Sequence, residues 1–367
     1  MKQESKVYSE TNRLPIKPPV YNISDALSKR INILKLWLII MVVFIHSYTT
    51  TVNFVSNDVS LVVPQWLEIV KYIISQCISR CAVPAFFMIS AILLYRKPFK
   101  WKNNLVKKTK TLLVPYLILN TFWILFYFVC QHIPMLSDYF SNPDNIVAEW
   151  GIGKWISVYL FEPFLYPLWF VRNLFLLNIF SKVIKFIVDK IPWLSLIVAF
   201  LVWYLLPFSV NKDTIFWVFG CFIVNKNINL NALDRIPKSL MWVLYAALIA
   251  ADVITRNLFF NNYIHGIAVI CGIIFFFVCL TDFKEGKFKS AVLAVSSYSF
   301  GIYLFHEQNL SILRKLCTKF LPQTALIQTL EYFLIPAFII FACIILCMIL
   351  NKIAPKFYAV LVGNRKQ

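Results

Sequence analysis

Charged residues and glycine are both scarce in this chain of 367 residues. Only 14% of its residues are charged, whereas soluble domains have about 25%. The hydrophobic share is 60% and the mean hydropathy is +0.71, so an ordinary soluble domain is excluded and an integral membrane protein is indicated. The 8 glycines are few for a bundle whose helices approach one another through small residues.

The nine cysteines form no CxxC pair, and no His/Cys spacing typical of a metal site is present in the sequence. Most of them lie inside or beside apolar segments. We interpret them as small buried apolar residues and expect neither a disulfide nor a bound metal.

The net charge of +19 would suit a nucleic-acid-binding protein, but the basic residues cluster between apolar segments, so we expect no nucleic-acid partner. No cleavable signal peptide is evident, because a polar stretch of about thirty residues precedes the first apolar segment. The predicted organisation is an N-terminal tail (1–30), one transmembrane domain (31–352) and a C-terminal tail (353–367).

Ten apolar runs approach the length needed to cross a bilayer, about 17–25 residues. The predicted fold class is therefore an all-α integral membrane protein, a bundle of about ten transmembrane helices. The predicted spans are approximately 33–51, 77–95, 110–130, 167–188, 192–208, 213–225, 239–256, 263–281, 291–309 and 329–350.

Lysine and arginine are distributed unequally between the two sides of the predicted membrane. With the N-terminus inside, 26 of the 36 basic residues fall in inner segments and six in outer segments. Positive charge marks the cytoplasmic side of membrane proteins. We therefore expect a multi-pass protein of the plasma membrane with both termini in the cytoplasm and lipids as its surroundings.

His46 lies within the first apolar span, eleven residues after Lys35, which is about 16 Å along a helix. This spacing predicts a position near the middle of the bilayer. An ionisable side chain there is costly and is typical of a functional site. A purely structural histidine is the alternative.

Other ionisable residues are predicted near the outer ends of later spans, where they could line one outward-opening polar cavity with His46. They are Arg80, Arg172, His306, Glu307 and Glu162. The alternatives are that the arginines only extend their head groups to the outer interface and that His306 is a structural hydrogen-bonding residue.

A basic segment, residues 96–110, is predicted on the inner side, which Lys35 also faces. Its lysines 107, 108 and 110 could hold a phosphate-bearing donor together with Lys35. The same lysines could instead be only a topology signal or a patch for lipid headgroups.

Four segments in order resemble the acyltransferase-3 family of integral membrane acyltransferases. They are INILKLWLIIMVVFIH, SRCAVPAFFMISAILL, PLWFVRNLFLL and SSYSFGIYLFHEQ. The resemblance covers about residues 28 to 350. The chain departs from the family pattern where Lys35 replaces the usual arginine and where Ser90-Ala91 replaces Ser-Gly; lysine keeps the charge but loses the bidentate geometry of arginine.

The resemblance implies transfer of an acyl group, most often acetyl, from cytoplasmic acyl-coenzyme A to a hydroxyl of a cell-envelope glycan. It implies no permanently bound cofactor. His46 would be a general base or a nucleophile that forms an acyl-histidine, and these remain open. Lys35 and the lysines at 107, 108 and 110 would bind the donor. The remaining residues would bind the acceptor or stabilise the transition state; they are Arg80, Arg172, His306 and Glu307.

Two other function classes stay open from the residues alone. One is a transporter or flippase of glycan or lipid intermediates, with His46 as a proton-relay site. The other is a structural subunit of an envelope complex, which would not need His46.

Overall fold

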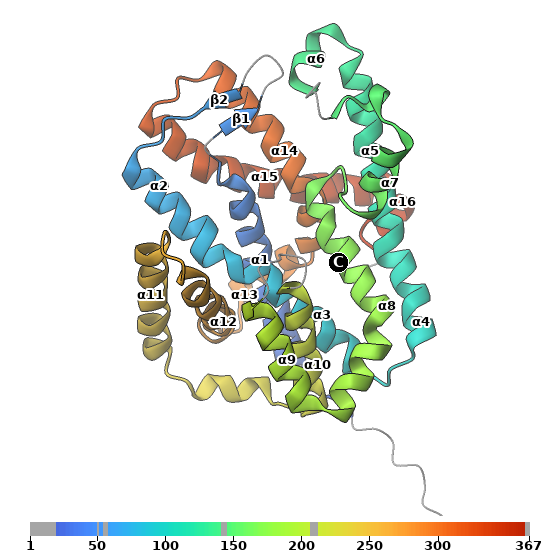
Figure 1. The fold of residues 1–367 in the computed structure, drawn as a ribbon, viewed down its shortest axis with the longest axis vertical. Helices are drawn as coiled ribbons and strands as arrows, with labels where there is room; N and C mark the ends of the chain where they lie inside the picture. Colours follow the sequence, from blue (N-terminus) through green and yellow to red (C-terminus); the bar gives the residue numbers. More distant parts are fainter. Residues whose placement is uncertain (1–19, 50, 54–57, 141–144, 206–211, 364–367) are drawn as a thin grey trace, which may run out of the picture.

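Helix α1 (Asp25–Ser47) lies at the centre of the protein (Figure 1). The fold is given by a computed structural model, which describes residues 20–49, 51–53, 58–140, 145–205 and 212–363. Ser24 caps the helix by accepting a hydrogen bond from the backbone N–H of Leu27. Asp25 follows in the first turn, where the helix dipole favours negative charge.

Helices account for almost all of the remaining described structure, so the predicted all-α class is confirmed. Their bounds are α2 Gln65–Tyr72, α3 Ala82–Tyr95, α4 Trp101–Lys108, α5 Val114–Gln131, α6 Pro134–Phe140, α7 Ile152–Leu160, α8 Trp169–Lys190, α9 Pro192–Leu205, α10 Lys212–Asn225, α11 Lys238–Thr255, α12 Asn261–Leu280, α13 Lys287–Ser296, α14 Ser299–Phe320, α15 Ala325–Ile353 and α16 Pro355–Leu361. One small antiparallel hairpin follows α1, in which β1 (Thr51–Asn53) pairs with β2 (Asp58–Ser60).

Six helical stretches of the described chain are long and apolar enough to cross a membrane, or up to eight if each of two bent pairs is one span. The bent pairs are α8 with α9, at 119°, and α13 with α14, at 61°. Each of the ten predicted spans falls mainly on a helix, but α10 is short and these bends leave the number ten a prediction. Residues 50 and 206–208, at the ends of two predicted spans, lie outside the described residues.

Two of the long stretches contain a π-helical turn. Residues Ile73–Ile78 join α2 to the short 3-10 turn before α3, and residues Thr109–Leu113 join α4 to α5. Such turns widen a helix locally and are frequent at functional sites. The first of them lies against α1, α11 and α12, so it connects the centre of the bundle to the α11–α12 pair.

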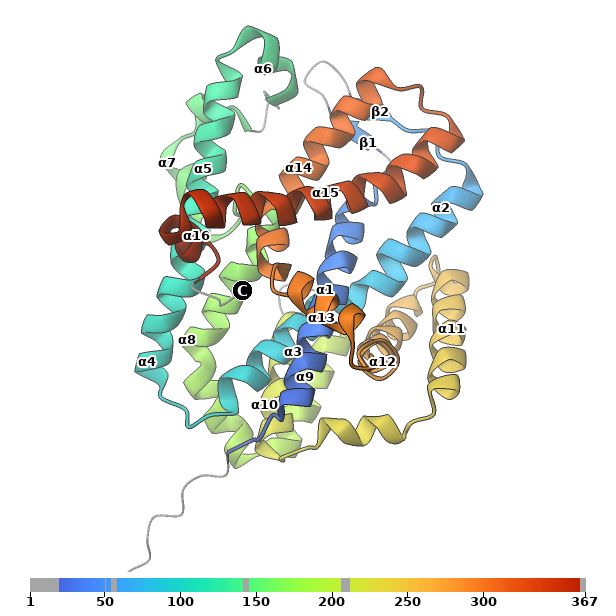
Figure 2. The same cartoon turned by 180° about the vertical axis from the view of Figure 1, so that it is seen from behind.

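Helix α1 packs against much of the bundle. α1 contacts α3, α12, α13, α14 and α15, and α16 turns back to pack on α5 (Figure 2). Arg30 is buried and donates both guanidinium amino groups to Asp234, at 2.7 and 2.8 Å. Arg30 lies inside α1, because the helix begins at Asp25, whereas the first span is predicted to begin at residue 33. The predicted tails include residues 1–19 and 364–367, which lie outside the described residues, and the domain boundaries stay a prediction.

Candidate functional site

His46 lies in the last turn of α1 rather than in the middle of its helix, because α1 starts earlier and ends earlier than predicted. The carbonyl groups of a last turn have no partner within the helix. Arg314 of α14 supplies one here, since its Nη2 donates to the His46 carbonyl oxygen at 3.2 Å. A cation at this end also complements the helix dipole. Arg314 therefore holds the backbone that carries His46.

His306 of α14 is the nearest histidine to His46, with ring centroids 5.1 Å apart. Its side chain is fully buried, and its Nδ1 lies 2.9 Å from the Tyr303 carbonyl oxygen and 3.1 Å from that of Ile302. Nδ1 must therefore carry the proton, because a carbonyl oxygen only accepts. Nε2 then presents a lone pair, and it has no hydrogen-bond partner within the described part of the chain.

Two tyrosines connect this histidine pair to the start of α8. Tyr166 places its ring centroid 6.0 Å from that of His46, and its side chain is largely exposed. Tyr303 donates a 2.6 Å hydrogen bond to the Pro167 carbonyl oxygen. The site is thus fixed between α1, α14 and the turn before α8, and it reaches the surface at Tyr166.

Charged side chains surround the pair. Arg80 and Arg314 both act electrostatically on His46, and Glu307 and Glu331 act on Arg314. Arg80 donates two hydrogen bonds to the side-chain oxygen of Gln76. Because Gln76 is a neutral amide, these bonds do not neutralise the charge of Arg80. The Oε2 atom of Glu307 is buried and has no hydrogen-bond partner among the described residues.

The π-helical turn at Ile73–Ile78 braces this end of α1. The Ser75 hydroxyl lies 2.6 Å from the Phe44 carbonyl oxygen and 2.7 Å from the Tyr332 hydroxyl. The same turn carries Gln76, the partner of Arg80. The widened turn therefore links the backbone below His46 to one of the cations beside it.

Of the residues predicted to share the site, His46, Arg80, His306 and Glu307 are brought together. Arg172 instead donates to the side-chain oxygen of its neighbour Asn173, and its charge acts on Tyr116 of α5. Glu162 is exposed after the end of α7.

Sequence reasoning missed Arg314, Tyr166, Ser75 and the π-helical turn. Arg314 follows Glu307 by seven residues, about two helical turns, so its place on the same face of one helix was available from spacing alone. The contacts of Ser75 depend on α1 and α15 and have no such local signal.

The predicted donor-binding lysines occupy a different part of the protein. Lys107 and Lys110 are exposed on α4 and the turn after it, and this segment packs on α8. Lys108 is half-buried there. Lys35 lies on α1, where its Nζ donates to Asn32. Both views show α4 at the outer side of α8, away from α1 (Figures 1 and 2).

A second histidine cluster joins α11 to α12. Asp252 is completely buried, and its carboxylate accepts a hydrogen bond from Asn261 at 2.8 Å. The Nδ1 atom of His265 lies 2.8 Å from the other Asp252 oxygen. Both carboxylate oxygens are therefore used.

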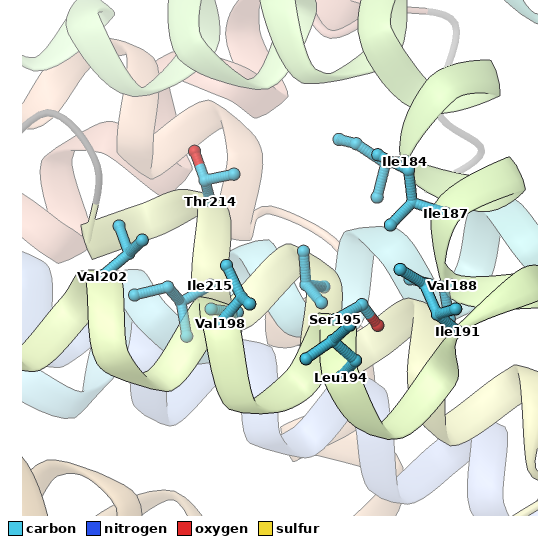
Figure 3. Close-up of a pocket in the computed structure, with 12 residues that line it drawn as sticks. Ile184, Ile187, Val188, Ile191, Leu194, Ser195, Val198, Val202, Thr214 and Ile215 are labelled. Carbon is cyan, nitrogen blue, oxygen red and sulfur yellow. The ribbon is translucent and has the colours of Figure 1, made fainter.

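An apolar pocket lies between α8, α9 and α10 (Figure 3). Its lining is aliphatic apart from the hydroxyls of Ser195 and Thr214, and no ionisable side chain among the described residues lines it that could activate either hydroxyl as a base. The described residues also contain no group of three or more His, Cys, Asp and Glu side chains placed to hold a metal ion.

Comparison with known proteins adds two findings. A family model described as an acyltransferase domain matches residues 28–352. The chain is also 26% identical over 357 residues to the succinoglycan biosynthesis protein ExoH of Rhizobium meliloti (strain 1021), with 92% of each chain covered. No solved structure matches.

Proposed function

The chain belongs to the acyltransferase-3 family and is a multi-pass membrane acyltransferase, and from this premise we propose that it moves an acyl group from cytoplasmic acyl-coenzyme A to a hydroxyl of a cell-envelope polysaccharide. An acetyl group is the proposed cargo. The similarity to a protein of succinoglycan biosynthesis supports a polysaccharide acceptor.

The observation that carries the proposal is the His46–His306 pair, in which one ring nitrogen has no hydrogen-bond partner among the described residues. His46 and His306 lie 5.1 Å apart between ring centroids, and the Nε2 atom of His306 is buried with its lone pair unused by the described residues. An acceptor hydroxyl that reaches this pair could donate to one of the rings and lose its proton to it. His46 is the proposed base, or the nucleophile of an acyl-histidine.

The cations beside the pair suit the charge that develops during acyl transfer. Attack on a thioester makes a tetrahedral oxyanion, which preorganised cations and donors stabilise. Arg80 is the proposed partner of that oxyanion, because its hydrogen bonds in the structure go to a neutral amide. We assign His306 and Glu307 to the binding of the acceptor or to the support of the transition state.

The donor is proposed to bind at the proposed cytoplasmic face, which carries the 96–110 segment. Lys107 and Lys110 are exposed there, and a phosphate-bearing coenzyme would find cations on α4, with Lys108 and Lys35 as further ligands. Cysteine labelling in intact cells tests the orientation. Labels on residues 97–108 should require permeabilised cells, and labelling from outside would overturn both the orientation and the donor site.

The function itself is tested in proteoliposomes that contain the purified full chain. Labelled acetyl-coenzyme A is supplied on the side of the 97–108 loop, and de-acylated envelope polysaccharide on the other. We expect label on the polysaccharide as a base-labile ester, and none with empty vesicles. Movement of intact polysaccharide or lipid intermediate without acyl transfer would instead favour the transporter, with His46 as a proton relay.

A further inference from the structure

A second large cavity lies away from the histidine pair, between α10 and α12. It measures about 400 Å³, and its walls come from α1, α3, α10 and α12. Every wall side chain except that of Asn229 is apolar; Leu34, Ile92, Phe219 and Ile273 are examples. A cavity of this composition suits hydrocarbon rather than a sugar or a nucleotide.

The cavity reaches the membrane-facing surface. α10 and α12 both pack on α3, and the cavity occupies the space between them. Phe219 and Ile223 of α10, with Ile270 and Ile274 of α12, line it and are each half-buried rather than fully enclosed. A lipid tail could therefore enter from the side without crossing a polar region.

The segment that joins α10 to α11 closes one end of the cavity. Its Asn229, Ala232 and Ile236 contribute to the lining. Two side chains from the start of the chain hold this segment in place, because the Tyr21 hydroxyl donates to the Ile228 carbonyl oxygen at 2.7 Å and Arg30 binds Asp234. The segment connects two membrane helices, so it lies where hydrocarbon gives way to headgroups.

Positive charge surrounds this closed end. Lys226, Arg235 and Lys238 are exposed on the segment, whereas its acid, Asp234, is already neutralised by Arg30. Lys226 lies over the Trp193 ring and Lys238 lies 3.4 Å from Asp282. Arg235 makes no ion pair with the described residues and sits between two residues of the cavity lining, Leu233 and Ile236.

We propose that this cavity binds one hydrocarbon tail of an anionic phospholipid, whose phosphate lies against Arg235. The apolar walls account for the tail, and the basic end accounts for the charge of the headgroup. The proposal does not depend on the acyl-transfer assignment, because it uses no residue of the histidine site.

The test uses the full chain in phosphatidylcholine vesicles with a photoactivatable phosphatidylglycerol that carries its reactive group in the tail. Labelled peptides are identified by mass spectrometry. We expect labels concentrated on the facing sides of α10 and α12. Ala232→Trp, at the exposed rim, should lower this labelling about tenfold. That is the change expected when the larger side chain excludes roughly two methylene groups of the lipid tail from the cavity. Leu240→Trp, an exposed residue outside the cavity, is the matched control and should change nothing.

The headgroup is tested separately. Arg235→Ala should lower labelling by about fivefold, the contribution of one cation near an anionic surface, and Arg235→Lys should retain most of it. Lys182→Ala, which removes an exposed cation outside the cavity, serves as the control. Equal labelling by a phosphatidylcholine probe would overturn the anionic headgroup. Unchanged labelling in both Ala232→Trp and Ile270→Trp would overturn the cavity as the tail site.

Discussion

His306 and His265 are both histidines of the helix bundle whose Nδ1 atom has a protein partner, but the partners differ. His306 bonds to backbone carbonyl oxygens, which fixes its tautomer and leaves Nε2 buried with no partner in the described structure. His265 bonds to Asp252, a carboxylate whose other oxygen is bonded by Asn261. The first cluster keeps a buried hydrogen-bonding group that no described residue uses, and the second uses its carboxylate completely.

This difference in hydrogen bonding distinguishes a candidate catalytic pair from a pair that stabilises the fold. A buried polar atom without a partner costs free energy and persists where a ligand or a reaction uses it. The His46–His306 pair fits that description and also has Arg80 beside it, whose hydrogen bonds go to a neutral amide. The Asp252–His265 pair lies at the α11–α12 junction, where a satisfied network fixes two helices. We therefore expect substitutions in the first pair to affect catalysis and those in the second to affect stability.

The largest effect is expected at His46. His46→Gln keeps much of the size of the side chain but cannot take up a proton, so acylation of the surface glycan in cells should fall about 10²-fold or more. The amount of inserted protein should stay normal. Near-normal acylation by a well-expressed His46→Gln protein would reject the catalytic assignment.

A smaller loss is expected at His306. His306→Asn can still donate to the Tyr303 carbonyl oxygen but lacks the Nε2 acceptor, so kcat should fall about tenfold, the equivalent of one hydrogen bond. Thermal stability should change little. A variant that loses stability while keeping its kcat would place His306 with the structural histidines.

The second cluster should respond in the opposite way. Asp252→Asn removes the charge and leaves the His265 Nδ1–H facing a poorer acceptor, so the free energy of unfolding should fall by about 1–3 kcal/mol. Thermal unfolding in detergent measures this, and the transfer rate per folded molecule should be unchanged. A stable Asp252→Asn protein that is inactive would extend the reaction site to α11 and α12.

The smallest effect is expected on the basic segment, which lies far from both clusters. Lys107→Ala with Lys108→Ala should weaken acyl-coenzyme A binding several-fold at low salt, and the difference should shrink at high salt because the contacts are ionic. Lys182→Ala with Lys190→Ala, two exposed lysines at other positions, is the control. Equal affinity of both double variants and the wild type would make the 96–110 lysines a topology signal only.

The parts of this structure that the sequence could predict are those set by local hydrophobicity and by the family motifs. The apolar runs place the helices, and the motifs bring His46, Arg80 and His306 to one site. The residues at which the helices begin and end were harder to predict from the sequence. Arg30 reads as a tail cation because its partner Asp234 is 204 positions away, and only the folded chain places that carboxylate beside α1.

One of the two bends and the capping contacts were hidden from sequence reasoning. The 119° turn between α8 and α9 falls at Pro192, where two separate spans are predicted and where proline cannot continue the hydrogen bonds of α8. The 61° turn between α13 and α14 falls inside one predicted span, 291–309, and apolar composition does not reveal it. At the end of α1, Arg314 donates to the His46 carbonyl oxygen from a distant part of the chain. The position of His46 in its helix was mispredicted because α1 runs from Asp25 to Ser47 rather than over 33–51.

The comparison of the two histidine clusters is tested most directly by one rate measurement. Purified wild-type, His46→Gln and His265→Gln proteins, matched for folded protein by size-exclusion chromatography, are assayed for transfer of labelled acetyl from acetyl-coenzyme A to polysaccharide. We predict a rate for His46→Gln at least about 10²-fold below wild type and a rate for His265→Gln close to wild type. Equal rates for the two variants would contradict the assignment of catalysis to the His46 site.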